Sequence, residues 1–150
     1  EFDHTQVMER LRPEWQDRER MARDLAAFPK PARAFQQVFE EAMQRWVSGG
    51  HDHEYTESWE AFRQRVITSL EQLIEYADGG ETLVSTSGGP IAVIAQHLLE
   101  LSDRKALDMN SVIANTSVTR VLHSGARRSL AVFNNYSHLE AEDPSLVTFR

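Results

Sequence analysis

One stretch of this chain restricts its fold more than any other, because it places a strand, a turn of small residues and a helix in immediate succession. Residues Thr82 to Thr86 have the composition of a buried strand, Ser87-Gly88-Gly89 forms the turn, and Pro90 opens a helix. Proline is favoured at the first helical position, since its missing N–H would have no partner there. A single strand followed directly by a helix is typical of a parallel sheet covered on both faces. The pattern predicts an α/β fold.

The same turn offers a chemical hypothesis. Small side chains between a strand and a helix leave backbone N–H groups exposed at the positive end of the helix dipole, where a phosphate or another anion can bind. The alternative interpretation is that small residues only let the helix pack tightly on the sheet. Sequence alone leaves both interpretations open.

Composition excludes several classes of protein. With 23 acidic and 16 basic residues the formal charge is −7, which argues against a broad nucleic-acid surface. No apolar run approaches the roughly 20 residues that cross a membrane. The chain has no cysteine, which excludes a disulfide framework and a thiol nucleophile. We expect a cytoplasmic protein that contacts neither nucleic acid nor membrane, and homo-oligomerisation stays open.

Hydrophobic spacing predicts helices through most of the first half of the chain, including residues 33–47 and 57–77. Alternation predicts an antiparallel hairpin that joins Val118–His123 to Ser129–Asn134. The three tryptophans fall at core positions of helices, His97 is interpreted as a packing histidine, and Arg127-Arg128 as a solvated turn. One parallel-type strand and one hairpin are too few strands for so many amphipathic helices.

The order of motifs resembles the histidine phosphatase superfamily, the phosphoglycerate mutase-like proteins. Ser58-Trp-Glu-Ala-Phe-Arg-Gln-Arg-Val66 resembles the family's long helix, and Val84-Ser-Thr-Ser-Gly-Gly-Pro-Ile91 resembles a strand that ends in Ser-His-Gly-Gly. Downstream, Asn115-Thr-Ser-Val118, the hairpin and Asn134-Asn-Tyr-Ser-His-Leu139 follow in the family's order. The opening Glu1-Phe-Asp-His4 resembles the segment that carries an acidic proton donor.

This resemblance implies a three-layer α/β/α fold of the phosphoglycerate mutase-like type. Residues 1–150 would form a single, partial domain with a helical insert at about residues 9–57, and its N-terminal strands would be missing from this chain. Family members attack phosphorus with the histidine of an Arg-His-Gly motif and form a transient phosphohistidine. No Arg-His-Gly occurs in these 150 residues. The resemblance therefore implies a phosphatase in the complete protein and an inactive chain as given.

The resemblance also assigns the site residues. Glu1 would be the proton donor, with Asp3 as a competing candidate and a solvated terminal charge as the alternative. Thr86, Ser87, Gly88 and Gly89 would bind the phosphoryl group, with Ser87 in the position of the family's second histidine. Ser87 has two other interpretations, a helix N-cap and, less favoured, a serine nucleophile.

The implied substrate is a small phosphorylated molecule, and neither a metal nor a cofactor is expected. His51 and His53 lie in an acidic loop and suggest a metal site, but a solvated loop is the favoured interpretation. A competing function is a non-catalytic binding or regulatory module whose phosphate pocket has lost its charged residues.

Overall fold

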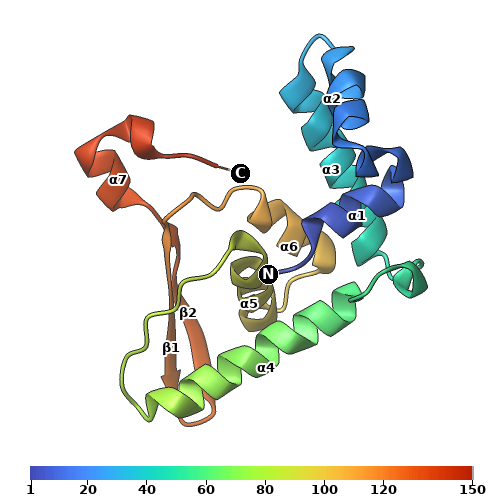
Figure 1. Cartoon of the computed structure of the whole chain (residues 1–150). Coiled ribbons are helices and arrows are strands. Elements are labelled where there is room, and N and C mark those ends of the chain that lie inside the picture. The colour runs from blue at the N-terminus through green and yellow to red at the C-terminus, as the bar shows by residue number, and fades with distance from the viewer. Residues whose placement is uncertain (150) are drawn as a thin grey trace. The chain divides into compact units, whose positions relative to one another are not determined.

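The structure is a computed structural model that describes residues 1–149 (Figure 1). Its contacts divide the chain into two compact units. Phe2–Phe62 form the first, which we call the helical unit. Glu1 and the chain from Arg63 onward form the second, which we call the mixed unit. The long helix α4 (Trp59–Ala77) begins in the helical unit and continues into the mixed unit.

The helical unit contains α1 (His4–Leu11), α2 (Arg18–Ala26), α3 (Pro31–Val47) and two short 3₁₀ helices, Pro13–Gln16 and Asp52–Glu54. Local chemistry sets their starts. The side chain of Asp3 accepts a hydrogen bond from the Gln6 amide at 2.9 Å, and Asp17 accepts two from the first turn of α2. Pro31 occupies the first turn of α3. The helices predicted for this half of the chain are present.

An aromatic cluster forms the core of the helical unit. Trp46 is 1% exposed and its ring contacts those of Phe2, Tyr55, Trp59 and Phe62 at centroid distances of 4.9–6.5 Å. The indole Nε1 of Trp46 donates to the Glu57 carbonyl at 2.9 Å, so its polar atom is also satisfied. Trp15, Trp46 and Trp59 are all buried, which confirms their predicted core positions.

The mixed unit contains most of α4, then α5 (Gly88–Leu99), α6 (Asp103–Asn110), strands β1 (Val118–Ser124) and β2 (Arg127–Asn135), and α7 (Ser137–Glu142). The strands pair antiparallel, with Val118 opposite Asn135 and Ser124 opposite Arg127. Gly125 supplies the positive φ of 55° in the turn. The predicted hairpin is therefore confirmed. Helix α5 packs against α6 and β2.

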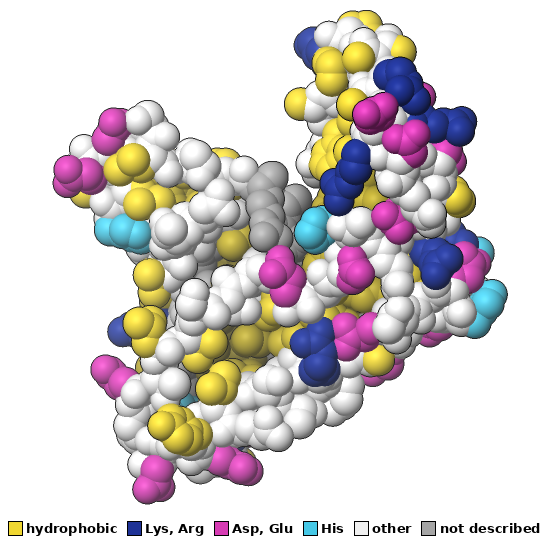
Figure 2. All heavy atoms as spheres, viewed as in Figure 1, with side chains coloured by type: hydrophobic (Ala, Val, Ile, Leu, Met, Phe, Trp, Pro, Cys, Tyr) yellow, Lys and Arg dark blue, Asp and Glu magenta, His cyan; other side chains and the backbone are white. Residues whose placement is uncertain are grey.

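The predicted strand at Thr82–Thr86 is wrong for this chain. Residues 81–87 have no regular secondary structure, Leu83 is 100% exposed and Val84 48%. A strand forms only where a neighbour accepts and donates its backbone hydrogen bonds, and the sheet of the described residues contains β1 and β2 alone. Hydrophobic side chains reach the surface around the end of α4, where this segment starts (Figure 2).

The described residues form a mixed fold of helices and a small sheet, as expected for an α/β protein, and the three-layer arrangement stays a prediction. Helix α6 was not predicted from the sequence, because most of its residues are polar. Its N-cap is Ser102, whose side chain accepts from the Lys105 amide. No helix within residues 1–149 has the length and apolar character needed to cross a membrane.

Candidate functional site

The predicted phosphate-binding residues lie together at the N-terminus of α5. Ser87 is the N-cap, with extended backbone angles of −95° and 174°, and its carbonyl accepts from the Ile91 amide at 3.5 Å. Gly88 and Gly89 are the first helical residues and precede Pro90, which was predicted to start the helix. The helix therefore begins two residues earlier than predicted.

The hydroxyl of Ser87 is a buried polar atom without a partner. Its Oγ is inaccessible to solvent and makes no hydrogen bond, and it does not cap α5. The first backbone N–H groups of a helix have no hydrogen-bond acceptor within the helix. Those of Gly88 and Gly89 find none elsewhere in residues 1–149 either. Leaving a buried hydroxyl unpaired costs about 1–3 kcal/mol. This end of α5 thus carries three donors that have no acceptor among residues 1–149.

Asn110 lies against this helix end and was not predicted as a site residue. A Cβ atom built on Gly88 would lie 2.8 Å from Asn110 Oδ1 and 3.8 Å from Ile113. The side-chain amide of Asn110 makes no hydrogen bond with any residue of the described chain. The sequence carries no pattern that points to Asn110, since the contact joins the start of α5 to the end of α6.

Two asparagines of the family-like motifs hold the loop that follows α6. Asn134, with a positive φ of 52°, accepts from the Ala114 amide at 2.9 Å and donates to the Val112 carbonyl at 2.7 Å. Asn115 donates through Nδ2 to Thr148 Oγ1 at 2.9 Å. These bonds fix the loop that contains Ile113 against the end of β2. The two asparagines therefore position the wall of the site.

Glu1, the predicted proton donor, belongs to the mixed unit together with Ser87. Its side chain is exposed, and its backbone carbonyl accepts from Arg65 Nη2 on α4 at 3.1 Å. Thr86 is exposed on the segment before α5. The structure thus groups Thr86, Ser87, Gly88 and Gly89 at one helix end, and the catalytic role of Glu1 stays a prediction.

An ion pair between Arg128 and Glu71 attaches the end of the hairpin to α4. The prediction that Arg128 is a solvated turn residue is therefore wrong. Arg128 Nε and Nη2 donate to the two carboxylate oxygens of Glu71 at 3.1 and 2.7 Å. These hydrogen bonds from Arg128 hold the pKa of Glu71 below its usual value. The pair joins two elements of the mixed unit that are distant in sequence.

The acidic histidine loop forms a hydrogen-bonded cluster within the helical unit. Arg45 Nη2 lies 2.7 Å from both carboxylate oxygens of Glu54, and His51 Nδ1 lies 3.1 Å from one of them. The hydrogen bond from Arg45 lowers the pKa of Glu54. Residues 1–149 contain no group of three or more His, Cys, Asp or Glu side chains that could hold a metal ion.

His97 was predicted to pack in the core, and this prediction is wrong, because His97 is exposed on α5.

Comparison with known protein families gives one match. The family model of the histidine phosphatase superfamily (branch 1) matches residues 5–136. Searches of curated proteins and of solved structures gave no match to the chain. The family match includes the long helix, the turn at Ser87 and the hairpin, and it covers most of the 150 residues. The chain belongs to the histidine phosphatase superfamily.

Proposed function

We propose that the complete protein hydrolyses a small phosphomonoester, and that Thr86, Ser87, Gly88 and Gly89 bind its phosphoryl group. The observation that carries this proposal is the Ser87 hydroxyl, buried and without a partner beside two unpaired glycine amides. Each of these groups donates a hydrogen bond, and phosphoryl oxygens are acceptors. A phosphate at a helix N-terminus also gains from the helix dipole.

The reaction would proceed by covalent catalysis. In this superfamily a histidine of Arg-His-Gly attacks phosphorus, the ester oxygen leaves with a proton from a carboxylic acid, and water then cleaves the phosphohistidine. Residues 1–150 contain no Arg-His-Gly, so the nucleophile would come from outside this stretch of sequence. Glu1 is the proposed acid. The donors of α5 would stabilise the negative charge on the transferring group.

Ser87 changes the strength of this binding. A hydroxyl donates one hydrogen bond but carries no charge, whereas a protonated histidine in the same position adds charge. Charge-assisted hydrogen bonds are about twice as strong as neutral ones. Phosphate affinity and transition-state stabilisation would both be lower than in members with histidine. This absence of charge favours a second candidate, a non-catalytic phosphate-binding or regulatory module.

Activity measurements on two proteins test the proposal. The first is the chain of residues 1–150, and the second is the same chain preceded by a segment that carries Arg-His-Gly. Hydrolysis of an aryl phosphate is followed with and without a metal chelator, and acid-stable or acid-labile phosphate on the protein is measured after rapid quenching. We expect no hydrolysis above buffer from the first protein, and turnover with an acid-labile phosphohistidine from the second.

Variants at residue 87 connect the activity to the site. In the longer protein, Ser87→His should raise the rate, and Ser87→Ala should lower it by the effect of one unmade hydrogen bond, about 1–3 kcal/mol. Phosphate binding without turnover in the longer protein would support the non-catalytic module. Metal-independent turnover by residues 1–150 alone would show that the nucleophile is misplaced, and His4 would be the first residue to replace.

A further inference from the structure

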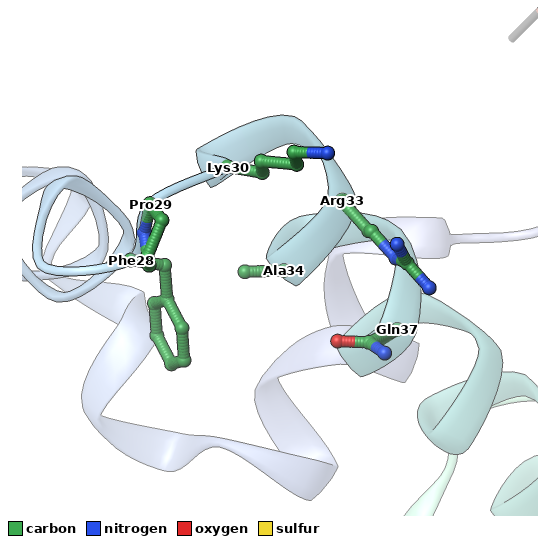
Figure 3. Close-up of a pocket in the computed structure, with 6 residues that line it drawn as sticks. All are labelled: Phe28, Pro29, Lys30, Arg33, Ala34 and Gln37. Atoms are coloured by element: carbon green, nitrogen blue, oxygen red, sulfur yellow. The ribbon is translucent and has the colours of Figure 1, made fainter.

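The helical unit has an open hollow between the end of α2 and the start of α3. Its volume is about 260 Å³, and it is lined by Phe28, Pro29, Lys30, Arg33, Ala34 and Gln37. In Figure 3, Phe28 lies on one side of the hollow and the cationic ends of Lys30 and Arg33 lie on the other, with Ala34 between them. The lining therefore combines an apolar side and a positively charged side.

The positive charge at this hollow is not neutralised by the protein. Lys30 and Arg33 form no ion pair or side-chain hydrogen bond with any residue from 1 to 149, and the lining includes no acidic residue. The first turn of α3 contains no acidic residue either. Some cations elsewhere in the helical unit do have partners, as Arg45 has in Glu54 and Arg23 in Asp17 and Glu19. What distinguishes Lys30 and Arg33 is that both line the same hollow as the half-exposed ring of Phe28.

The apolar side is also incompletely covered. Phe28 is 53% exposed although its amide is fixed by a hydrogen bond to the Leu25 carbonyl at 3.1 Å. Ala34 is 7% exposed and forms a buried part of the lining. Burying the free face of an aromatic ring is favourable because it removes apolar surface from water. The hollow can therefore gain free energy from both parts of a ligand that is apolar at one end and anionic at the other.

We propose that this hollow binds a small ligand in which an aromatic ring or short apolar group carries an anionic group, a carboxylate or a phosphate. The ring would pack on Phe28 and Pro29, and the anionic group would accept charge-assisted hydrogen bonds from Lys30 and Arg33. A closed cavity of about 150 Å³ holds one benzene molecule, so the volume here suffices for a ring with an anionic substituent. The proposal is independent of the phosphate site at Ser87.

Titrations followed by amide chemical shifts in the chain of residues 1–150 test it. The probes are benzoate and phenyl phosphate, with benzylamine as the cationic analogue and inorganic phosphate as the anion without a ring. We expect benzoate and phenyl phosphate to shift the amides of residues 28–37 saturably, with a dissociation constant of about 1 mM or below. Benzylamine and inorganic phosphate should leave these amides unshifted or bind at least tenfold more weakly.

Charge-matched variants locate the site. The double variant Lys30→Ala/Arg33→Ala should weaken benzoate binding at least tenfold, whereas Arg18→Ala/Arg20→Ala removes the same charge from exposed positions of α2 and should leave it unchanged. Circular dichroism checks that both variants remain folded. Equal binding by benzylamine, equal binding by inorganic phosphate, shifts that do not saturate, or unchanged binding in the Lys30/Arg33 variant would each overturn the proposal. Because benzoate lacks phosphorus, its result does not depend on the site at Ser87.

Discussion

Replacing Ser87 by alanine distinguishes the two roles that its position allows. A serine N-cap that bonds the helix stabilises it, and its loss to alanine costs about 0.5–2 kcal/mol. Ser87 makes no such bond, and its Oγ is buried without a partner. Removing a buried, unpaired hydroxyl relieves a cost of about 1–3 kcal/mol. We therefore expect Ser87→Ala to stabilise the mixed unit by about 1 kcal/mol, against the usual direction for an N-cap substitution.

Ser102→Ala is the matched control, since Ser102 caps α6 in the same unit and accepts from the Lys105 amide at 3.4 Å. Its replacement should destabilise by about 0.5–1 kcal/mol. Urea unfolding followed by far-UV circular dichroism measures both changes. With an m-value of about 2 kcal/mol/M, a change of 1 kcal/mol moves the midpoint by about 0.5 M.

Local measurement is needed as well, because the three tryptophans belong to the helical unit and their fluorescence does not report on α5. Hydrogen exchange of the α5 amides gives that measurement, and Ser87→Ala should slow it. Destabilisation by Ser87→Ala similar to that of Ser102→Ala would show that the hydroxyl caps α5 in solution. That result would refute the claim that the hydroxyl is free for a phosphoryl oxygen.

Three further predictions concern packing and charge. Phe62→Ala should destabilise the helical unit by about 3–5 kcal/mol, since the Phe62 ring is 0% exposed within the aromatic cluster. Urea unfolding followed by tryptophan fluorescence measures this change. The control Phe28→Ala removes a half-exposed ring and should cost less than about 1 kcal/mol. Gly88→Ala should cost less than about 1 kcal/mol, because the closest contact of the added Cβ is Asn110 Oδ1, the far end of a side chain that can rotate away. Asn110→Ala should remove that cost in the double variant, so strict additivity would contradict the contact. The Glu71 pKa is lower in the folded chain than in the unfolded chain, so its stabilising effect is present above about pH 4 and is lost as pH falls through the folded pKa. Acid unfolding of Glu71→Gln compared with the unchanged chain should show a stability difference at neutral pH that shrinks below about pH 4.

Features that depend on local sequence were predictable. Helical spacing predicted a core face on α4 with seven members, Trp59, Phe62, Val66, Leu70, Leu73, Ile74 and Ala77. The first four are buried, whereas the last three are partly exposed. The hairpin followed from alternation on either side of a glycine-containing turn, and next to the turn β1 and β2 keep one register from Val121 opposite Leu130 to Ser124 opposite Arg127. In both cases the residues that determine the structure lie within a few positions of one another.

Features that depend on contacts between distant segments were not predictable. Asn110 and Gly88 are separated by α5 and α6, and no spacing rule links them. Arg128 and Glu71 lie in a hairpin and in a helix, and sequence alone gave Arg128 no partner. The predicted phosphate-binding residues lie at one helix end because they are contiguous, and their role stays a prediction. The contact of the loop after α6 with this helix end was not predicted.

The segment before α5 shows why composition predicts a strand only conditionally. Thr82–Thr86 has the residues of a buried strand, yet Leu83 is fully exposed, because no described strand pairs with it. Only residues on its C-terminal side then fix the position of Ser87. The Ile91 amide donates a hydrogen bond to the Ser87 carbonyl, and Gly88 packs against Ile113. Thr86 has no comparable restraint and is exposed. If residues 82–86 paired with a neighbouring strand, the backbone hydrogen bonds of that pair would fix Thr86 as well. A well-defined phosphate site at residues 86–89 therefore requires this strand pairing in addition to the hydrogen-bond donors at the start of α5.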